Sequence, residues 1–464
     1  MTLTMSVGKQ LPIVKFSYAR SFLAGCETYF IAPTAWYYVR SLGQDELFLA
    51  FVLSVFNVTA IIGGPLFGRI VDRFGYPRHF FILTCCLKVF SYVLYSINIS
   101  GFFPLFGRLI SGLSAGGTVA ILQGQVALQT TVENRASVFV LMQGIYCLGG
   151  TFGPAIGSFI TFDVTIWGWH INQGNSPGLV LTMIWTVYLT LALIAPKHMW
   201  VETGTTHSKG ARSLSDDDTK SGRDLVEMDP SLSKKEKRAE SAKDHLIKTS
   251  SRRTLAGTDH EGLPKIEWNS RILCLLFLVF SNESLSSTAT FYVPVLALNH
   301  FHLKLIHVKL LFLNCTAFTL LVLILFSMAS KRVEERKLFV VALAMQLTAL
   351  ALLTSLGFAW EHISYFQNYI LLLYICFGMP YFAFPFSNTI LSKITNPGNA
   401  SFYQGVSFAA MHFGIVSSRV VISFIQTQEV LLIYCLALIC LWLVGSVWFS
   451  IHFKQFAGTG YDDK

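Results

Sequence analysis

Five ionisable residues stand inside long apolar stretches of this chain: Arg20, Glu27, Arg108, Glu283 and Arg419. Charged side chains are costly in such surroundings and usually serve a binding site or an ion pair. An arginine can hold an anionic group, and a buried carboxyl group can take up and release a proton. These residues therefore predict a site for a small anionic solute whose movement is linked to a proton.

Each residue also has a structural interpretation. Arg20 and Lys88 have side chains long enough to extend to the end of an apolar stretch. Arg419 could form an ion pair at an outer gate. Glu27 and Glu283 lie near the middle of their stretches, where they could be locked in permanent ion pairs that only hold helices together. The sequence shows no Ser/His/Asp set, phosphate loop or metal-ligand spacing, so we expect no enzyme activity, cofactor or metal.

The elements that position these residues are apolar runs of membrane-spanning length. The chain has 464 residues, 53% hydrophobic and only 13% charged, whereas soluble proteins carry about 25% charged residues. A run of about 20 apolar residues crosses a bilayer as a helix. Twelve runs are predicted, at 13–40, 46–68, 79–98, 103–128, 136–161, 176–196, 270–296, 305–329, 337–356, 367–391, 402–425 and 429–453. The fold class is therefore an all-α membrane protein.

One long polar interval, residues 197–268, divides the runs into six and six. Its segment "SDDDTKSGRDLVEMDPSLSKKEKRAE" is charged and poor in aromatics, which predicts a disordered linker. It separates an N-terminal unit, 1–196, from a C-terminal unit, 269–464. Lysines and arginines gather in this linker and in the loops after the second and eighth runs, which predicts that both termini and the linker are cytosolic. The net charge of +9 collects on that face, so we do not expect nucleic-acid binding.

The turn after the second run reads "GRIVDRFGYPR" and contains Gly68, Asp72, Arg73, Gly75 and Arg78. This pattern resembles the G-x-x-x-D-R-x-G-x-x-[RK] signature of the major facilitator superfamily of transporters. A departure is that Tyr76 and Pro77 replace the usual basic residue after the second glycine. The resemblance implies two six-helix bundles around a central cavity. It also implies that Asp72 contacts the start of the eleventh helix, near Ser401, and holds the cytosolic gate shut.

Two further signatures follow in order. "FGRLISGLSAGG" places Arg108, Gly112, Gly116 and Gly117 in an R-x-x-x-G-x-x-x-G pattern, in which small residues let helices approach closely. "GGTFGPAIGS" resembles the superfamily's G-x-x-x-G-P-x-x-G-G element, with packing or hinge positions Gly149, Gly153, Pro154 and Gly157. Proline there removes a backbone donor and is expected to kink the helix.

Within the superfamily, "SGLSAGGTVAILQGQVALQTTVENRAS", "FSNESLSSTATFY" and "ASFYQGVSFAA" resemble the lysosomal branch called major facilitator superfamily domain-containing protein 8, which is linked to neuronal ceroid lipofuscinosis. That resemblance implies a late-endosomal or lysosomal membrane, with the plasma membrane as the alternative. We expect a monomeric, lipid-embedded secondary transporter that works by alternating access. An anion-conducting channel on the same scaffold, or a regulatory member that does not transport, remains the alternative.

Overall fold

The computed structural model describes residues 12–159, 164–166, 169–172, 174–202, 265–295, 305–358, 365–378, 382–425 and 427–457. Most of the predicted linker, residues 203–264, lies outside this part of the chain. The elements of the first half are α1 (Pro12–Phe30), α2 (Ala32–Ser41), α3 (Glu46–Phe74), α4 (Pro77–Ser96), α5 (Phe102–Gln129), α6 (Val132–Phe159), β1 (Val164–Ile166), β2 (Trp169–Ile171), α7 (Ser176–Ile194) and the 3-10 turn Lys197–Met199.

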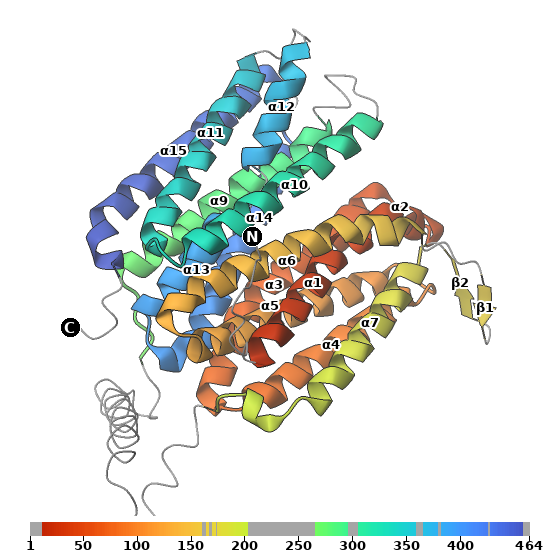
Figure 1. Cartoon of the computed structure of the whole chain (residues 1–464). Helices are drawn as coiled ribbons and strands as arrows, with labels where there is room; N and C mark the ends of the chain where they lie inside the picture. The colour runs from red at the N-terminus through yellow and green to blue at the C-terminus, as the bar shows by residue number, and fades with distance from the viewer. Residues whose placement is uncertain are drawn as a thin grey trace, which may run out of the picture.

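The second half contains α9 (Ser270–Val295), α10 (Leu305–Ala329), α11 (Glu335–Phe358), α12 (Tyr365–Gly378), α13 (Ala383–Ile394), the 3-10 turn Pro397–Asn399, α14 (Ala400–Ile422), α15 (Gln428–His452) and the 3-10 turn Phe453–Phe456. Figure 1 shows two bundles, one of α1–α7 and one of α9–α15. We call them the N-bundle and the C-bundle. The predicted fold class, two helical bundles in one chain, is confirmed.

The helices match the predicted apolar runs, but one run is interrupted. The first run is divided into α1 and α2 beside Pro33, a residue that favours the first turn of a new helix. The tenth run contains α12 and α13, and residues 379–381 between them lie outside the described part of the chain. Among the described residues, nine helical stretches are long and apolar enough to cross a membrane. The other predicted runs correspond to α1–α2, α6 and α10.

Glycines allow helices of the two bundles to approach closely. Gly64 and Gly68 of α3 face Gly405 and Ser401 of α14, and a Cβ atom on Gly68 would lie 2.5 Å from the Ser401 carbonyl oxygen. Small residues four apart on both helices let the backbones touch. Since α3 belongs to the N-bundle and α14 to the C-bundle, this seam joins the two bundles.

Each bundle also has its own hydrophobic core. In the N-bundle, Trp185 and Tyr188 of α7 pack with Phe81 and Tyr92 of α4. In the C-bundle, Tyr374 of α12 packs with Leu353 of α11 and Leu431 of α15. These outer helices bury their apolar side chains away from the seam. The polar residues that lie between the bundles belong to the inner helices, among them α1, α5 and α14.

Candidate functional site

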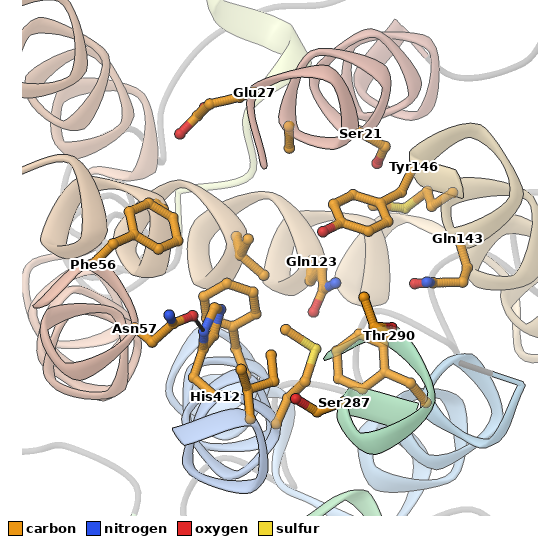
Figure 2. Close-up of a pocket in the computed structure, with 18 of the residues that line it drawn as sticks. Ser21, Glu27, Phe56, Asn57, Gln123, Gln143, Tyr146, Ser287, Thr290 and His412 are labelled. Carbon is orange, nitrogen blue, oxygen red and sulfur yellow. Dashed lines mark hydrogen bonds between the residues drawn. The ribbon is translucent and has the colours of Figure 1, made fainter. Parts of the chain in front are cut away.

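A cavity of about 220 Å³ lies between the two bundles. Its walls come from α1, α3, α5 and α6 of the N-bundle and from α9, α13 and α14 of the C-bundle. In Figure 2, the labelled side chains of Glu27, Gln123, Tyr146 and His412 surround the same open space. The volume is slightly below the roughly 300–1,000 Å³ typical of small-molecule sites, so the cavity fits a small solute.

Glu27 lines the cavity but already has a partner. Its Oε1 lies 2.5 Å from Nζ of Lys88, a residue of α4 that is only 1% exposed. The same ammonium group donates to the carbonyl oxygen of Ser111 at 3.1 Å and to its hydroxyl at 2.9 Å. The pair is therefore a buried contact between α1, α4 and α5, which fits the structural interpretation of Glu27.

Arg108 is buried in the cavity wall without such a partner. Its guanidinium carbon lies 4.4 Å from the centre of the Phe56 ring, and the side chain is close to fully buried. Its Nε has no hydrogen-bond partner, and no ion pair holds it within the described residues. A buried cation without a counter-charge is unfavourable, so this position suits an anion that arrives with a ligand.

The structure places the other two predicted arginines in the same wall. Nη2 of Arg20 donates to the Thr118 hydroxyl at 3.2 Å and reaches the Ala115 carbonyl oxygen at 3.5 Å. The guanidinium carbon of Arg419 lies 3.8 Å from the centre of the Phe291 ring. Arg20, Arg108 and Arg419 thus line one cavity, in which Glu27 is the only carboxylate among the described lining residues.

Glu283 lies outside the cavity. It is fully buried on α9, where its Cβ would meet a Cβ on Gly414 of α14 at 3.0 Å. Both carboxyl oxygens are without hydrogen-bond partners in the described part of the chain. Ser287, one turn further along α9, does line the cavity. The two predicted carboxylates therefore sit in different surroundings, Glu27 paired and Glu283 unpaired.

Asp72, near the end of α3, contacts the start of α14 in the other bundle. Its carboxylate accepts hydrogen bonds from the backbone N–H groups of Ser401, at 3.2 Å, and Phe402, at 2.7 Å. These N–H groups belong to the first turn of α14, where an anion is stabilised by the helix dipole. Beside it, Nη1 of Arg69 donates to Oδ1 of Asn399 at 2.9 Å. The C-terminal end of α3 is thus hydrogen-bonded to the start of α14 and to the turn before it.

A second contact between the bundles, which the sequence did not reveal, involves Arg135 at the start of α6. Its Nη1 donates to the carbonyl oxygen of Ser392 at 3.3 Å and to its hydroxyl at 3.1 Å. Ser392 lies in the last turn of α13, where a cation is favoured. Asp72 therefore contacts the N-terminal end of α14 and Arg135 the C-terminal end of α13. Each carries the charge that the helix dipole favours at that end. "ENRAS" marks Arg135 only as a polar loop residue.

Two polar contacts between the bundles lie closer to the cavity. Nδ2 of Asn388 donates to Oε1 of Gln123 at 3.4 Å, and Nδ1 of His412 lies 3.0 Å from Oδ1 of Asn57. All four residues line the cavity. Asn57 and Asn388 were not predicted as site residues, because single amides in apolar runs are common.

The remaining motif residues have local structural contacts. Gly75 ends α3 with a positive φ of 71°, a conformation that glycine adopts easily. Arg78 donates to the Leu193 carbonyl oxygen at 2.9 Å, and Arg73 is exposed. Gly149 and Gly153 pack against the α1 backbone between Phe22 and Cys26, next to Glu27. The side-chain surroundings of Pro154 and Gly157 lie outside the described residues.

Comparison with known proteins agrees with this arrangement. Residues 20–419 match the family model for the Major Facilitator Superfamily. An uncharacterized MFS-type transporter, YwfA of Bacillus subtilis, is 30% identical over 149 residues, which are 32% of this chain and 35% of that protein. The multi-drug resistance efflux pump PmrA of Streptococcus pneumoniae is 29% identical over 146 residues, 30% of this chain and 36% of the pump. The matched stretch spans about a third of these curated relatives.

Solved structures match over almost the whole chain. The human organic anion transporter MFSD10 has a TM-score of 0.61 at 15% identity, covering 94% of this chain and 98% of that one. The proton:xylose symporter XylE has a TM-score of 0.66 at 15% identity, covering 94% of both chains. The chain belongs to the Major Facilitator Superfamily. It is thus a multi-pass membrane protein of a transporter family, not of an enzyme family.

Proposed function

We propose that this protein is a secondary transporter that moves a small organic or inorganic anion by alternating access. One observation carries the proposal: Arg108 is a buried guanidinium in a cavity wall, without a hydrogen bond at Nε or an ion pair among the described residues. Arg20 lies in the same wall, and Glu27 already forms an ion pair with Lys88. A solute anion would supply the charge that this wall lacks.

The closed end of the cavity favours a carrier over a channel. The contacts of Asp72, Arg69 and Arg135 join the bundles beyond one end of the cavity. On α3, α13 and α14 the residues that line the cavity lie toward the opposite ends of the helices, whereas on α6 they begin one turn after Arg135. We take the closed end as cytosolic, following the predicted orientation, so this conformation would face the lumen or the outside. A structural relative, FucP, has been solved in an outward conformation.

Proton linkage would depend on Glu283 more than on Glu27. The positive charge of Lys88 keeps Glu27 in a stable ion pair, whereas an unpaired, fully buried carboxylate at Glu283 is strongly disfavoured. We infer that Glu283 carries a proton in this conformation. Cys147 of α6 faces it from the N-bundle, and His412 of α14 turns to Asn57 instead. Rearrangement of α9 against α14 would let the proton leave.

The remaining parts of the proposal concern location and assembly. We propose a late-endosomal or lysosomal membrane, because the segments of α5, α6, α9 and α14 quoted above resemble that branch of the superfamily. An acidic lumen would supply the proton gradient. We also propose that the chain works as a monomer, because both walls of the cavity come from one chain.

Flux through purified protein in liposomes tests the proposal. Uptake of a panel of labelled carboxylates should be saturable, and Arg108→Ala should abolish it. Arg108→Lys should retain part of the activity, since lysine keeps the charge but not the planar two-point contact. Arg40→Ala, which removes an exposed arginine at the end of α2, is the matched control. Unchanged carboxylate flux in a folded Arg108→Ala protein would refute the anion site.

A further inference from the structure

The cavity combines a cationic strip with a largely apolar lining. Its aromatic lining residues are Phe56, Phe139, Tyr146, Phe291, Phe384 and Phe408. Further apolar lining side chains are Leu53, Val119, Met142, Pro385, Met411 and Ile415. A cavity for a fully hydrophilic ion would need polar groups on every side to replace water. Single polar side chains occur on every wall of this cavity, but apolar side chains make up most of the lining, and two of its three arginines, Arg20 and Arg108, lie along α5.

The cationic strip follows one face of α5. Arg108 stands on it, Lys88 is bound at Ser111, and Arg20 is bound at Ala115 and Thr118. Positions 108, 111, 115 and 118 repeat at three- and four-residue intervals, so they lie on one face of the helix. The charged head of a solute would therefore be held along α5, with Arg108 as its first contact.

The apolar surface opposite belongs to the C-bundle. Phe408, Met411 and Ile415 are spaced three and four residues apart on α14, and Phe384 of α13 lies in the same lining. Phe408 also packs with Val119 of α5, next to the strip. Methionine and aromatic side chains adapt to flat apolar groups. A solute whose head rests on Arg108 would place the rest of its body against these side chains.

We propose that the transported solute is an amphipathic organic anion: a carboxylate-type head bound by Arg108, with an aromatic or aliphatic body packed against Phe384, Phe408 and Met411. This rests on the proposed anion transport. It excludes chloride and small hydrophilic acids as the main solutes, because they would leave the α14 face in contact with ordered water. The solute would also touch both bundles at once, which is required for it to promote closure of the cavity.

Binding of three matched probes to the purified full-length protein in nanodiscs tests the proposal. The probes are 2-naphthoate, acetate and the neutral alcohol 2-naphthylmethanol, measured by calorimetry. We expect 2-naphthoate to bind at least tenfold more tightly than acetate, and the alcohol not to bind measurably. Arg108→Ala should remove the binding of both carboxylates.

Variants of Met411 separate the contribution of the apolar contact to binding from that of the charge. Met411→Gln, which keeps the length of the side chain, should weaken 2-naphthoate binding severalfold and leave acetate unchanged, whereas Met411→Leu should bind both probes as the native protein does. Thermal unfolding of each variant checks that it is folded. If acetate binds as tightly as 2-naphthoate, or Met411→Gln weakens both equally, the amphipathic solute is refuted while the anion site stands. If no carboxylate binds and Arg108→Ala changes nothing, both proposals fail.

Discussion

Nζ of Lys88 lies 2.5 Å from Oε1 of Glu27, and the two charges are buried together at the cavity wall. This contact changes the role that we expect of Glu27. A carboxylate that is tied to a lysine of a neighbouring helix is poorly suited to load and unload a proton. It instead cancels one charge of a cation cluster, and it leaves the arginines to meet the solute.

Loss of one partner of this pair should destabilise the protein. Lys88→Met leaves Glu27 as an uncompensated buried charge, a change that costs about 3–5 kcal/mol in comparable pairs. We expect a lower unfolding temperature in detergent and poor recovery of folded protein. The double variant Glu27→Gln/Lys88→Met should recover most of the loss. Equal destabilisation by the single and double variants would show that packing, and not charge, is what Lys88 contributes.

Weakening the Asp72 contact should open the closed end. Asp72→Asn replaces a carboxylate that accepts from two N–H groups of α14 with an amide that can accept through one oxygen. Contacts of this kind contribute about 0.3–2 kcal/mol, enough to change occupancy severalfold. A cysteine introduced at Gln404, which is 1% exposed, should react faster with a membrane-impermeant reagent added from the α3–α4 side. Arg332→Gln, at an exposed position between α10 and α11, is the control and should react at the native rate.

The glycine seam should be equally sensitive. Gly405→Ala would place a Cβ atom against the carbonyl of Gly64, closer than atoms can approach, so α3 and α14 must separate. Spin labels at Tyr76 and Lys331, both exposed, should report a longer distance between the bundles at this end. Gly144→Ala is the matched control, because its Cβ would meet Leu323 at an ordinary 3.6 Å. An unchanged distance in Gly405→Ala would mean that the seam does not set the gate.

The two buried carboxylates should differ in their effect on pH dependence. Glu283→Gln mimics the protonated side chain permanently, so flux should become independent of lumenal pH while the protein stays folded. Glu27→Gln should lower stability, since it leaves Lys88 unpaired, and the flux that remains should keep its pH dependence. Proteoliposomes with a fixed outer pH and a varied inner pH provide the measurement. Native pH dependence in Glu283→Gln would assign the proton to another group.

Much of the fold could be predicted from the sequence, because apolar runs of membrane-spanning length leave few alternatives. The interruption between α1 and α2 was missed, since hydropathy averaged over twenty residues hides a short break. The place of Asp72 at the start of α14 came from the superfamily motif. The negative charge of Asp72 alone favours the N-terminus of a helix, but it does not indicate which helix.

The site was harder to predict because it depends on how each helix is rotated. Arg20, Glu27, Arg108 and Arg419 were identified by type and do line the cavity. Glu283 was placed with them, but one turn of α9 separates it from the lining at Ser287. The pairing of Glu27 with Lys88 joins helices that are not adjacent in sequence. Arg135 looks like any polar loop residue until the end of α13 is placed beside it.

The surplus of positive charge in the cavity has an electrical consequence. Among the described residues at the cavity wall and beside it, Arg20, Lys88, Arg108 and Arg419 outnumber Glu27 by three charges. A charge that crosses a membrane potential changes in energy by about 2.3 kcal/mol per 100 mV. The empty cavity would therefore sense voltage each time it changes the side it faces, and a negative cytosol would draw it inward. A bound anion would cancel part of that charge. Voltage would then act more strongly on the return of the empty protein than on the step that carries a monovalent solute.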